Sequence, residues 1–119
     1  MILADTSVWI DHLREGAGGL GDRLNSGSVL VHPFVIGELA CGNLRNRREV
    51  LALLHGMPMA RPATDAEVLY FIERNRLMGQ GIGYVDAHLL ASTALTPMAR
   101  LWTSDRRLAD LAAGLGLAY

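Results

Sequence analysis

The sequence predicts a three-layer α/β/α fold, in which helices cover both faces of a central parallel sheet. Three short apolar segments have the character of buried strands, and each is followed by a segment with helical spacing or a helix-capping residue. A strand that returns to the same sheet through a helix lies parallel to the strand before it. The chain has 119 residues, half of them hydrophobic, so we expect residues 1–119 to form a single domain with one core.

In the first half of the chain, two residues mark the starts of helices. Thr6 follows an apolar run and is a predicted N-cap, and Pro33 is suited to the first position of a helix. The expected elements of this half are a strand over 1–5, a helix over about 6–15, a short helix over 20–25, a strand over 28–31, a helix from Pro33 to about Gly42 and a helix ending at Gly56. Cys41, the only cysteine, excludes an internal disulfide and is expected to be a small core residue.

In the second half, Thr64 and Glu67 have the spacing of a capping box, and Pro97 ends a helix. Ser104 is a predicted N-cap. The expected elements are an amphipathic helix from Thr64 to near Gly79, a loop over 79–83, a helix over 84–95, a strand over 100–103, a helix over 105–113 and a last strand over 115–119.

Composition and charge exclude several classes of protein. No segment has the roughly 18 apolar residues of a membrane span, and no basic region precedes an apolar core at the N-terminus, so we expect a soluble, cytoplasmic protein without a membrane partner. The formal net charge of −1 produces no overall attraction for nucleic acid. Every basic side chain is Arg, and several of them cluster, so any contact with nucleic acid would be local.

Four carboxylates stand in otherwise apolar surroundings. Asp5 is the only charge in the first ten residues, and Glu38 is the only charge of its helix, where burial is expected. Asp86 is the only charge of its helix and lies in the first turn, and Asp105 follows a predicted strand. Taken singly, the three aspartates also fit structural roles, as helix caps or partners of a helix dipole. Together, because ligand sites in parallel sheets gather at the carboxyl ends of strands, the four are expected to converge.

Convergence of these acids predicts a metal site. Two carboxylates about 4 Å apart repel by roughly 4 kcal/mol at an effective dielectric near 20, so four require protons or a cation. Oxygen ligands without paired His or Cys favour Mg²⁺ or Mn²⁺, which activates water and stabilises charge on a phosphodiester. The chemistry predicted is that of a nuclease. Hydroxyls beside the acids are expected to orient a carboxylate or a water; they belong to Thr6, Thr103 and Ser104.

The four segments that carry these acids resemble the four motifs of the PIN-domain family, and within it the VapC-type ribonuclease toxins of toxin-antitoxin pairs. They are MILADTSVWIDHLR with Asp5, VIGELACG with Glu38, GYVDAHLLASTA with Asp86 and LWTSDRRL with Asp105. The resemblance spans nearly the whole chain. It implies a Mg²⁺- or Mn²⁺-dependent endoribonuclease that acts on structured RNA of the tRNA or rRNA class, forms a homodimer and is inhibited by a VapB-type antitoxin. It also implies that Asp5, Glu38, Asp86 and Asp105 are the catalytic metal ligands, the last one directly or through a water.

Two other readings remain open. A phosphoacceptor receiver domain also has this length and fold class and uses acids with Mg²⁺, but receivers and aspartate-nucleophile phosphatases need a lysine, and the sequence has none. The phosphatases also use a second Asp two residues after the first, where Ser7 stands. A non-catalytic binding module with the same fold is the other reading, against which the four intact acids argue.

Overall fold

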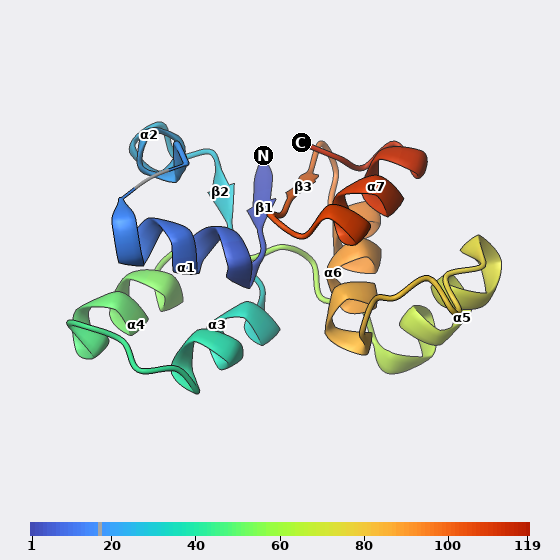
Figure 1. Ribbon diagram of the computed structural model, residues 1–119, viewed down its shortest axis with the longest axis horizontal. Helices are drawn as coiled ribbons and strands as arrows, with labels where there is room; N and C mark the ends of the chain where they lie inside the picture. Colours follow the sequence, from blue (N-terminus) through green and yellow to red (C-terminus); the bar gives the residue numbers. More distant parts are fainter. Residues whose placement is uncertain (17) are drawn as a thin grey trace.

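The computed structural model describes residues 1–16 and 18–119, and its centre is a parallel sheet in the order β2-β1-β3 (Figure 1). The strands are β1 (Ile2–Ala4), β2 (Val29–Leu30) and β3 (Arg100–Trp102). Ile2 pairs with Val29 on one side and with Arg100 on the other, so the first strand of the chain lies in the middle of the sheet. All residues of β1 and β2 are buried, which explains why both strands are uncharged. The predicted α/β class with a parallel sheet is confirmed.

Seven helices are described in residues 1–16 and 18–119, and they connect and follow the strands. The bounds are α1 (Thr6–Glu15), α2 (Leu20–Asn25), α3 (Pro33–Ala40), α4 (Arg47–His55), α5 (Asp65–Asn75), α6 (Tyr84–Leu95) and α7 (Arg106–Gly114). In the view of Figure 1, α1 to α4 lie on one side of the strands and α5 to α7 on the other.

The order of the strands creates a topological switch point. The chain passes from β1 to β2 through α1 and α2, and then returns beyond β1 to β3 through α3 to α6. Because parallel crossovers are right-handed, two crossovers that run in opposite directions cover opposite faces of the sheet. Ligand sites of open parallel sheets lie outside the carboxyl ends of the strands at such a reversal, which here is between β1 and β3.

Carboxylates, not the predicted hydroxyls, cap the helices that leave these two strands. Asp5 has extended backbone and accepts the Val8 N–H at 3.2 Å, so it replaces Thr6 as the N-cap of α1. Asp105 accepts the Leu108 N–H at 3.1 Å and replaces Ser104 at the N-terminus of α7. Both caps have extended backbone; α1 begins at Thr6 as expected, whereas α7 begins at Arg106, one residue later than expected.

Two other element boundaries differ from the prediction. Helix α5 ends at Asn75 rather than near Gly79, because Arg76 takes the left-handed conformation (φ 53°) that terminates a helix. The predicted last strand is only one parallel bridge, between Leu101 and Ala118, because the chain turns through Gly116 (φ 72°) just before it.

Cys41 is exposed and not a core residue. It follows the last residue of α3, whose buried side chains are Val35, Ile36 and Leu39, so its position lies beyond the buried face of the helix. The capping box is confirmed: Thr64 Oγ1 accepts the Glu67 N–H at 3.1 Å, and Glu67 Oε1 accepts the Thr64 N–H at 2.8 Å.

The hydrophobic core surrounds the sheet, and a smaller cluster joins α5 to α6. Leu3, Trp9, Leu20 and Leu90 are among the fully buried side chains of the main core. The smaller cluster consists of Ala63, Val68, Ala87 and Ala91. Across residues 1–16 and 18–119, no helix has the length and apolar character to cross a membrane.

Candidate active site

The four predicted carboxylates come from four different elements. Asp5 directly follows β1 and begins α1, and Asp105 lies shortly after β3 and begins α7. Glu38 lies in α3, and Asp86 lies in the first turn of α6. The two strand-end residues therefore flank the switch point between β1 and β3.

The pKa of Asp86 responds to burial and to the charges of the other three carboxylates. Burial raises the pKa of Asp86, which is half-buried, and a hydrogen bond from the Gly83 N–H partly offsets this increase. The negative charges of three carboxylates raise the pKa of Asp86 further; in order of decreasing effect they are Asp105, Asp5 and Glu38. Coulomb interactions weaken with distance, so the three acids that act on Asp86 are its neighbours.

Asp5 is buried and held by its own helix. Its Oδ1 atom accepts the Ser7 hydroxyl at 2.5 Å as well as the Val8 N–H. The Ser7 hydroxyl oxygen in turn accepts the Ser104 N–H at 3.0 Å, from the segment after β3. Ser7 therefore fixes one oxygen of Asp5 and ties the ends of β1 and β3 together.

The expected burial of Glu38 is wrong, because this side chain is exposed. The buried face of α3 is formed by Val35, Ile36 and Leu39, which turns Glu38 outward. The Thr6 hydroxyl donates to Glu38 Oε1 at 2.6 Å, so a residue of the first turn of α1 orients the carboxylate.

Asp86 and Asp105 are oriented mainly by main-chain groups. Asp86 Oδ2 accepts the Gly83 N–H at 3.2 Å, which links the carboxylate to the start of its own helix. Asp105 Oδ1 accepts the Leu108 N–H, and its own N–H donates to Thr103 Oγ1 at 3.0 Å. Thr103 therefore shapes the turn that presents Asp105.

The donor set fits a hard divalent cation. In each of the four carboxylates, one oxygen accepts a hydrogen bond. Within residues 1–16 and 18–119, the other oxygen accepts none. These free oxygens are Asp5 Oδ2, Glu38 Oε2, Asp86 Oδ1 and Asp105 Oδ2. The described part of the chain contains no group of three Asp, Glu, His or Cys side chains already gathered at ligand spacing. A common ion would therefore require these side chains to rotate toward one another. A cation there relieves the repulsion that raises the pKa of Asp86.

Comparison with known proteins identifies the family of the chain. The family model described as PIN domain matches residues 2–114. The chain belongs to the PIN-domain family. Ribonuclease VapC32 of Mycobacterium tuberculosis strain CDC 1551 / Oshkosh is 48% identical over 118 residues, which cover 99% of this chain and 95% of that protein. The ribonuclease VapC32 of strain ATCC 25618 / H37Rv matches with the same identity and coverage.

Two polar residues of this PIN domain were not among the predicted site residues. Ser7 joins Asp5 to Ser104, and Asp11 accepts the Ser104 hydroxyl at 3.0 Å. A signal for Ser7 exists in the sequence, because a hydroxyl two residues after an aspartate N-cap lies within reach of that carboxylate. No local signal identifies Asp11, because its partner is 93 residues away.

Proposed function

We propose that this PIN domain is a metal-dependent endoribonuclease toxin that hydrolyses phosphodiester bonds in structured RNA and is inhibited by a VapB-type antitoxin. The observation that carries the proposal is the pair of hydrogen bonds that bring Glu38 to Thr6 and the Ser104 N–H to Ser7, next to Asp5 and Asp105. The charges of Asp105, Asp5 and Glu38, which add to the effect of burial in raising the pKa of Asp86, support it. The 48% identity to proteins named ribonuclease VapC32 supports the reaction class.

In this proposal Asp5, Glu38 and Asp86 hold Mg²⁺ or Mn²⁺, and Asp105 acts directly or through a water. The cation supplies Lewis-acid stabilisation of the phosphodiester and lowers the pKa of water. The Ser7 hydroxyl holds one oxygen of Asp5, and the Thr6 hydroxyl holds one oxygen of Glu38. These hydrogen bonds limit the rotation of both carboxylates. Thr103 and Ser104 fix the turn before Asp105.

Arginines without a carboxylate partner support an RNA substrate. Within residues 1–16 and 18–119, no Arg lies within 4.0 Å of a carboxylate oxygen of Asp or Glu. Arg47 and Arg100 donate to main-chain carbonyls and Arg23 lies over the Tyr119 ring, whereas a guanidinium without such contacts is available to phosphates. Arg107 lies against Gly81, in the loop before α6, and thereby places a positive charge between the segments that carry Asp86 and Asp105. Structured RNA of the tRNA or rRNA class is the substrate that the family resemblance implies.

The antitoxin part of the proposal combines an apolar surface with the acidic site. Exposed large apolar side chains lie on α1, α3 and α4; they are Ile10, Leu13, Phe34 and Leu53. A helix of an antitoxin would cover such side chains, and an arginine beside it would pair with the carboxylates of the site. We further propose a cytoplasmic homodimer in which residues 1–119 of each chain are a single domain; sedimentation of the purified protein tests the dimer.

The proposal is tested by cleavage of total cellular RNA with and without added Mg²⁺ or Mn²⁺. We expect Asp5→Asn, Glu38→Gln and Asp86→Asn each to abolish cleavage while the circular dichroism spectrum is retained. Asp105→Asn should leave part of the activity. Asparagine is the suitable replacement at positions 5 and 105, because it keeps the helix cap and removes only the charge.

The alternatives give different results in the same assay. A non-catalytic PIN-like binding module would bind RNA but show no cleavage with either metal. A receiver-type phosphoacceptor would be labelled at Asp5 by a small phosphodonor and would not cleave RNA. An Asp5→Asn protein that cleaves RNA at the wild-type rate would contradict the proposed mechanism.

A further inference from the structure

We propose that Asp65, at the start of α5, is a positioning residue that sets the orientation of Asp86. This inference rests on the proposed metal-dependent function, because it concerns how one ligand of the proposed ion is held. Asp65 lies outside the four motifs and was not singled out for the site by the sequence.

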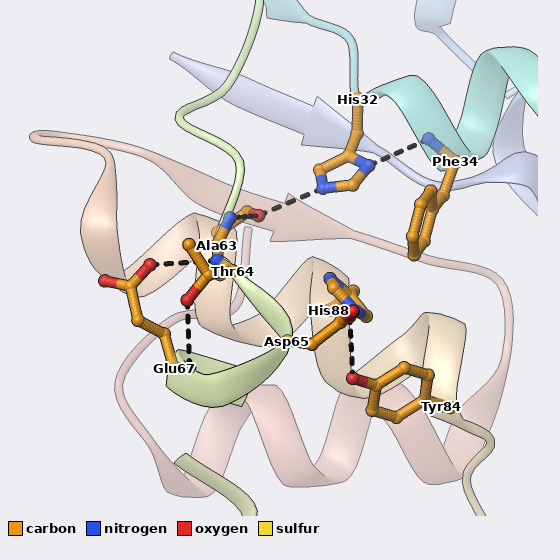
Figure 2. Close-up of polar contacts among 9 residues, drawn as sticks. His32, Phe34, Ala63, Thr64, Asp65, Glu67, Tyr84 and His88 are labelled. Carbon is orange, nitrogen blue, oxygen red and sulfur yellow. Dashed lines mark hydrogen bonds and ion pairs between the residues drawn. The ribbon is translucent and has the colours of Figure 1, made fainter. Parts of the chain in front are cut away.

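One oxygen of Asp65 holds two side chains of α6. Asp65 Oδ1 accepts the Tyr84 hydroxyl at 2.9 Å and contacts His88 Nε2 at 3.1 Å (Figure 2). The contact with His88 is the only pair between a basic side chain and a carboxylate within 4.0 Å in the described residues. A single carboxylate on α5 therefore joins the first and the fifth residue of α6.

These two side chains flank Asp86 in the helix. Tyr84 and His88 are four residues apart, so they lie on the same face of α6, one turn above the other. Asp86 is two residues from each and therefore points to the opposite face, away from α5 and toward the acids. A rotation of this turn that moved Tyr84 and His88 away from Asp65 would change the direction of Asp86 as well.

The packing between α5 and α6 is mainly apolar. The buried cluster between the two helices consists of Ala63, Val68, Ala87 and Ala91, and the partly buried side chains of Phe71, Ile72, Ile82 and Leu95 pack against it. Apolar burial holds the two helices together, but it is non-directional. The hydrogen bonds of Asp65 add a directional constraint at the start of α6.

His88 also receives support on its other side. Its ring is buried and lies 4.7 Å from the Tyr84 ring with an interplanar angle of 86°, and 4.5 Å from the Phe34 ring at the start of α3. Asp65 thus completes a set of contacts around His88 that includes α3, the helix of Glu38. The carboxylate acts on two helices of the proposed site while its own side chain stays 80% exposed.

Asp65 is not required as a helix cap. The N-terminus of α5 is capped by Thr64 and Glu67 through their reciprocal hydrogen bonds. Glu67 lies in the same turn as Asp65, carries the same charge and, within residues 1–16 and 18–119, makes no hydrogen bond or ion pair with α6. Glu67→Ala is therefore a matched control that weakens the start of α5 without releasing Tyr84 or His88.

The test is titration of the full chain with Mg²⁺ alone in a calorimeter. We expect Asp65→Ala to lower the affinity for Mg²⁺ by up to about tenfold, the lower end of the effect of removing a direct partner of a metal ligand, because Asp65 acts on Asp86 through Tyr84 and His88. Asp65→Asn keeps an acceptor oxygen and should stay within about twofold of wild type, and Glu67→Ala should bind Mg²⁺ with wild-type affinity. Equal affinity in wild type and Asp65→Ala would overturn the inference, as would an equal loss in Glu67→Ala.

Hydrogen exchange of the metal-free protein provides a second measurement. The Ala87 N–H donates to Gly83 O at 3.1 Å in the first turn of α6, so its exchange reports how firmly this turn is held. We expect faster exchange at Ala87 in Asp65→Ala and not in Glu67→Ala; unchanged exchange would contradict the inference. If wild type binds no Mg²⁺, the proposed metal site fails, whereas Mg²⁺ binding that is insensitive to Asp65→Ala removes only the positioning role.

Discussion

At the scale of single residues, the carboxylates of the site serve folding and the proposed chemistry at once. Asp5 and Asp105 each use one oxygen to cap a helix, and Glu38 and Asp86 each use one oxygen to accept a local hydrogen bond. The other oxygen of each is free for a ligand. Such a site is built from groups that destabilise one another until a cation is bound.

We expect Asp86→Asn to raise the melting temperature of the metal-free protein at neutral pH by a few degrees. The pKa of Asp86 is raised in the folded state, so its charged form is disfavoured there relative to the unfolded chain. Stability in the wild type therefore decreases as the pH rises from the ordinary range of Asp through the raised pKa. Asparagine carries no charge, so the Asp86→Asn protein does not lose this stability as the pH rises. The amide oxygen of the asparagine still accepts the Gly83 N–H.

Thermal melts at several pH values test this prediction. The gain should be present at neutral pH and vanish at a pH below the ordinary range of Asp, where both proteins are uncharged at this position. Asp110→Asn, an exposed position of α7, serves as the control for loss of one charge. A melting temperature lowered by Asp86→Asn at neutral pH would contradict the raised pKa.

A second prediction at this scale concerns Arg107. Because its guanidinium lies beside Gly81 and follows Asp105 by two residues, we expect Arg107→Ala to weaken RNA binding several-fold. The slope of log affinity against log salt should fall by about one, as for the loss of one phosphate contact. Filter binding in an Asp5→Asn background measures this without cleavage, with Arg14→Ala on α1 as the control. An unchanged salt slope would rule out the contact.

At the scale of elements, buried His32 joins the helices that carry Glu38 and Asp86. Its Nδ1 accepts the Phe34 N–H at 3.0 Å and caps α3 (Figure 2). In the neutral ring the proton is therefore on Nε2, which donates it to Ser92 Oγ, 3.0 Å away in α6. The Ala63 N–H, just before α5, also donates to Ser92 Oγ, at 3.4 Å. One neutral histidine thus links α3, α6 and the segment before α5.

We expect this link to weaken in acid. Burial, the larger cause, and the nearby His88 together lower the pKa of His32 from 6.5 to about 4. Because the folded pKa lies below the unfolded value, the unfolded chain binds the proton first, and stability is lost as the pH falls from about 6.5 toward 4. Above pH 6.5 the contribution of His32 is complete.

Comparison of wild type with His32→Asn by chemical denaturation at a series of pH values tests the link. Asparagine retains the N-cap of α3 but does not titrate, so the variant should be less stable than wild type at pH 7. The difference between the two proteins should shrink between pH 6.5 and 4. A difference that stays constant across this range would show that His32 does not titrate as described.

At the scale of the whole molecule, a cation bound by residues of α1, α3, α6 and α7 would connect elements from both ends of the chain. A ligand that binds only the folded state stabilises it by mass action, and at about 100 times its Kd the gain is about 2.7 kcal/mol. We therefore expect Mg²⁺ or Mn²⁺ to raise the melting temperature of wild type.

The matched variants for this prediction are Asp5→Asn and Asp86→Asn, in which the metal-dependent increase should be absent. Differential scanning fluorimetry over a range of metal concentrations measures the melting temperature of each protein. Sodium chloride at equal ionic strength controls for general screening of charge. A melting temperature that does not change with Mg²⁺ or Mn²⁺ in wild type would contradict the proposed metal site.

The sequence by itself determined the alternation of strands and helices, the parallel sheet and the isolation of four acids in apolar segments. These features are local: apolar runs, Pro33, and the capping box of Thr64 and Glu67 all act within a few residues, and the structure agrees with each of them. The choice of residues 5, 38, 86 and 105 as the catalytic set stays a prediction.

Only the tertiary structure decided which partners these residues meet. Glu38 is exposed because the packing of α3, not the composition of the helix, selects the buried face, and Thr6 reaches it from 32 residues away. The contact of Asp65 with His88 spans 23 residues, and that of Ser104 with Ser7 spans 97. Burial and side-chain pairing depend on the arrangement of whole elements, which no short stretch of sequence encodes.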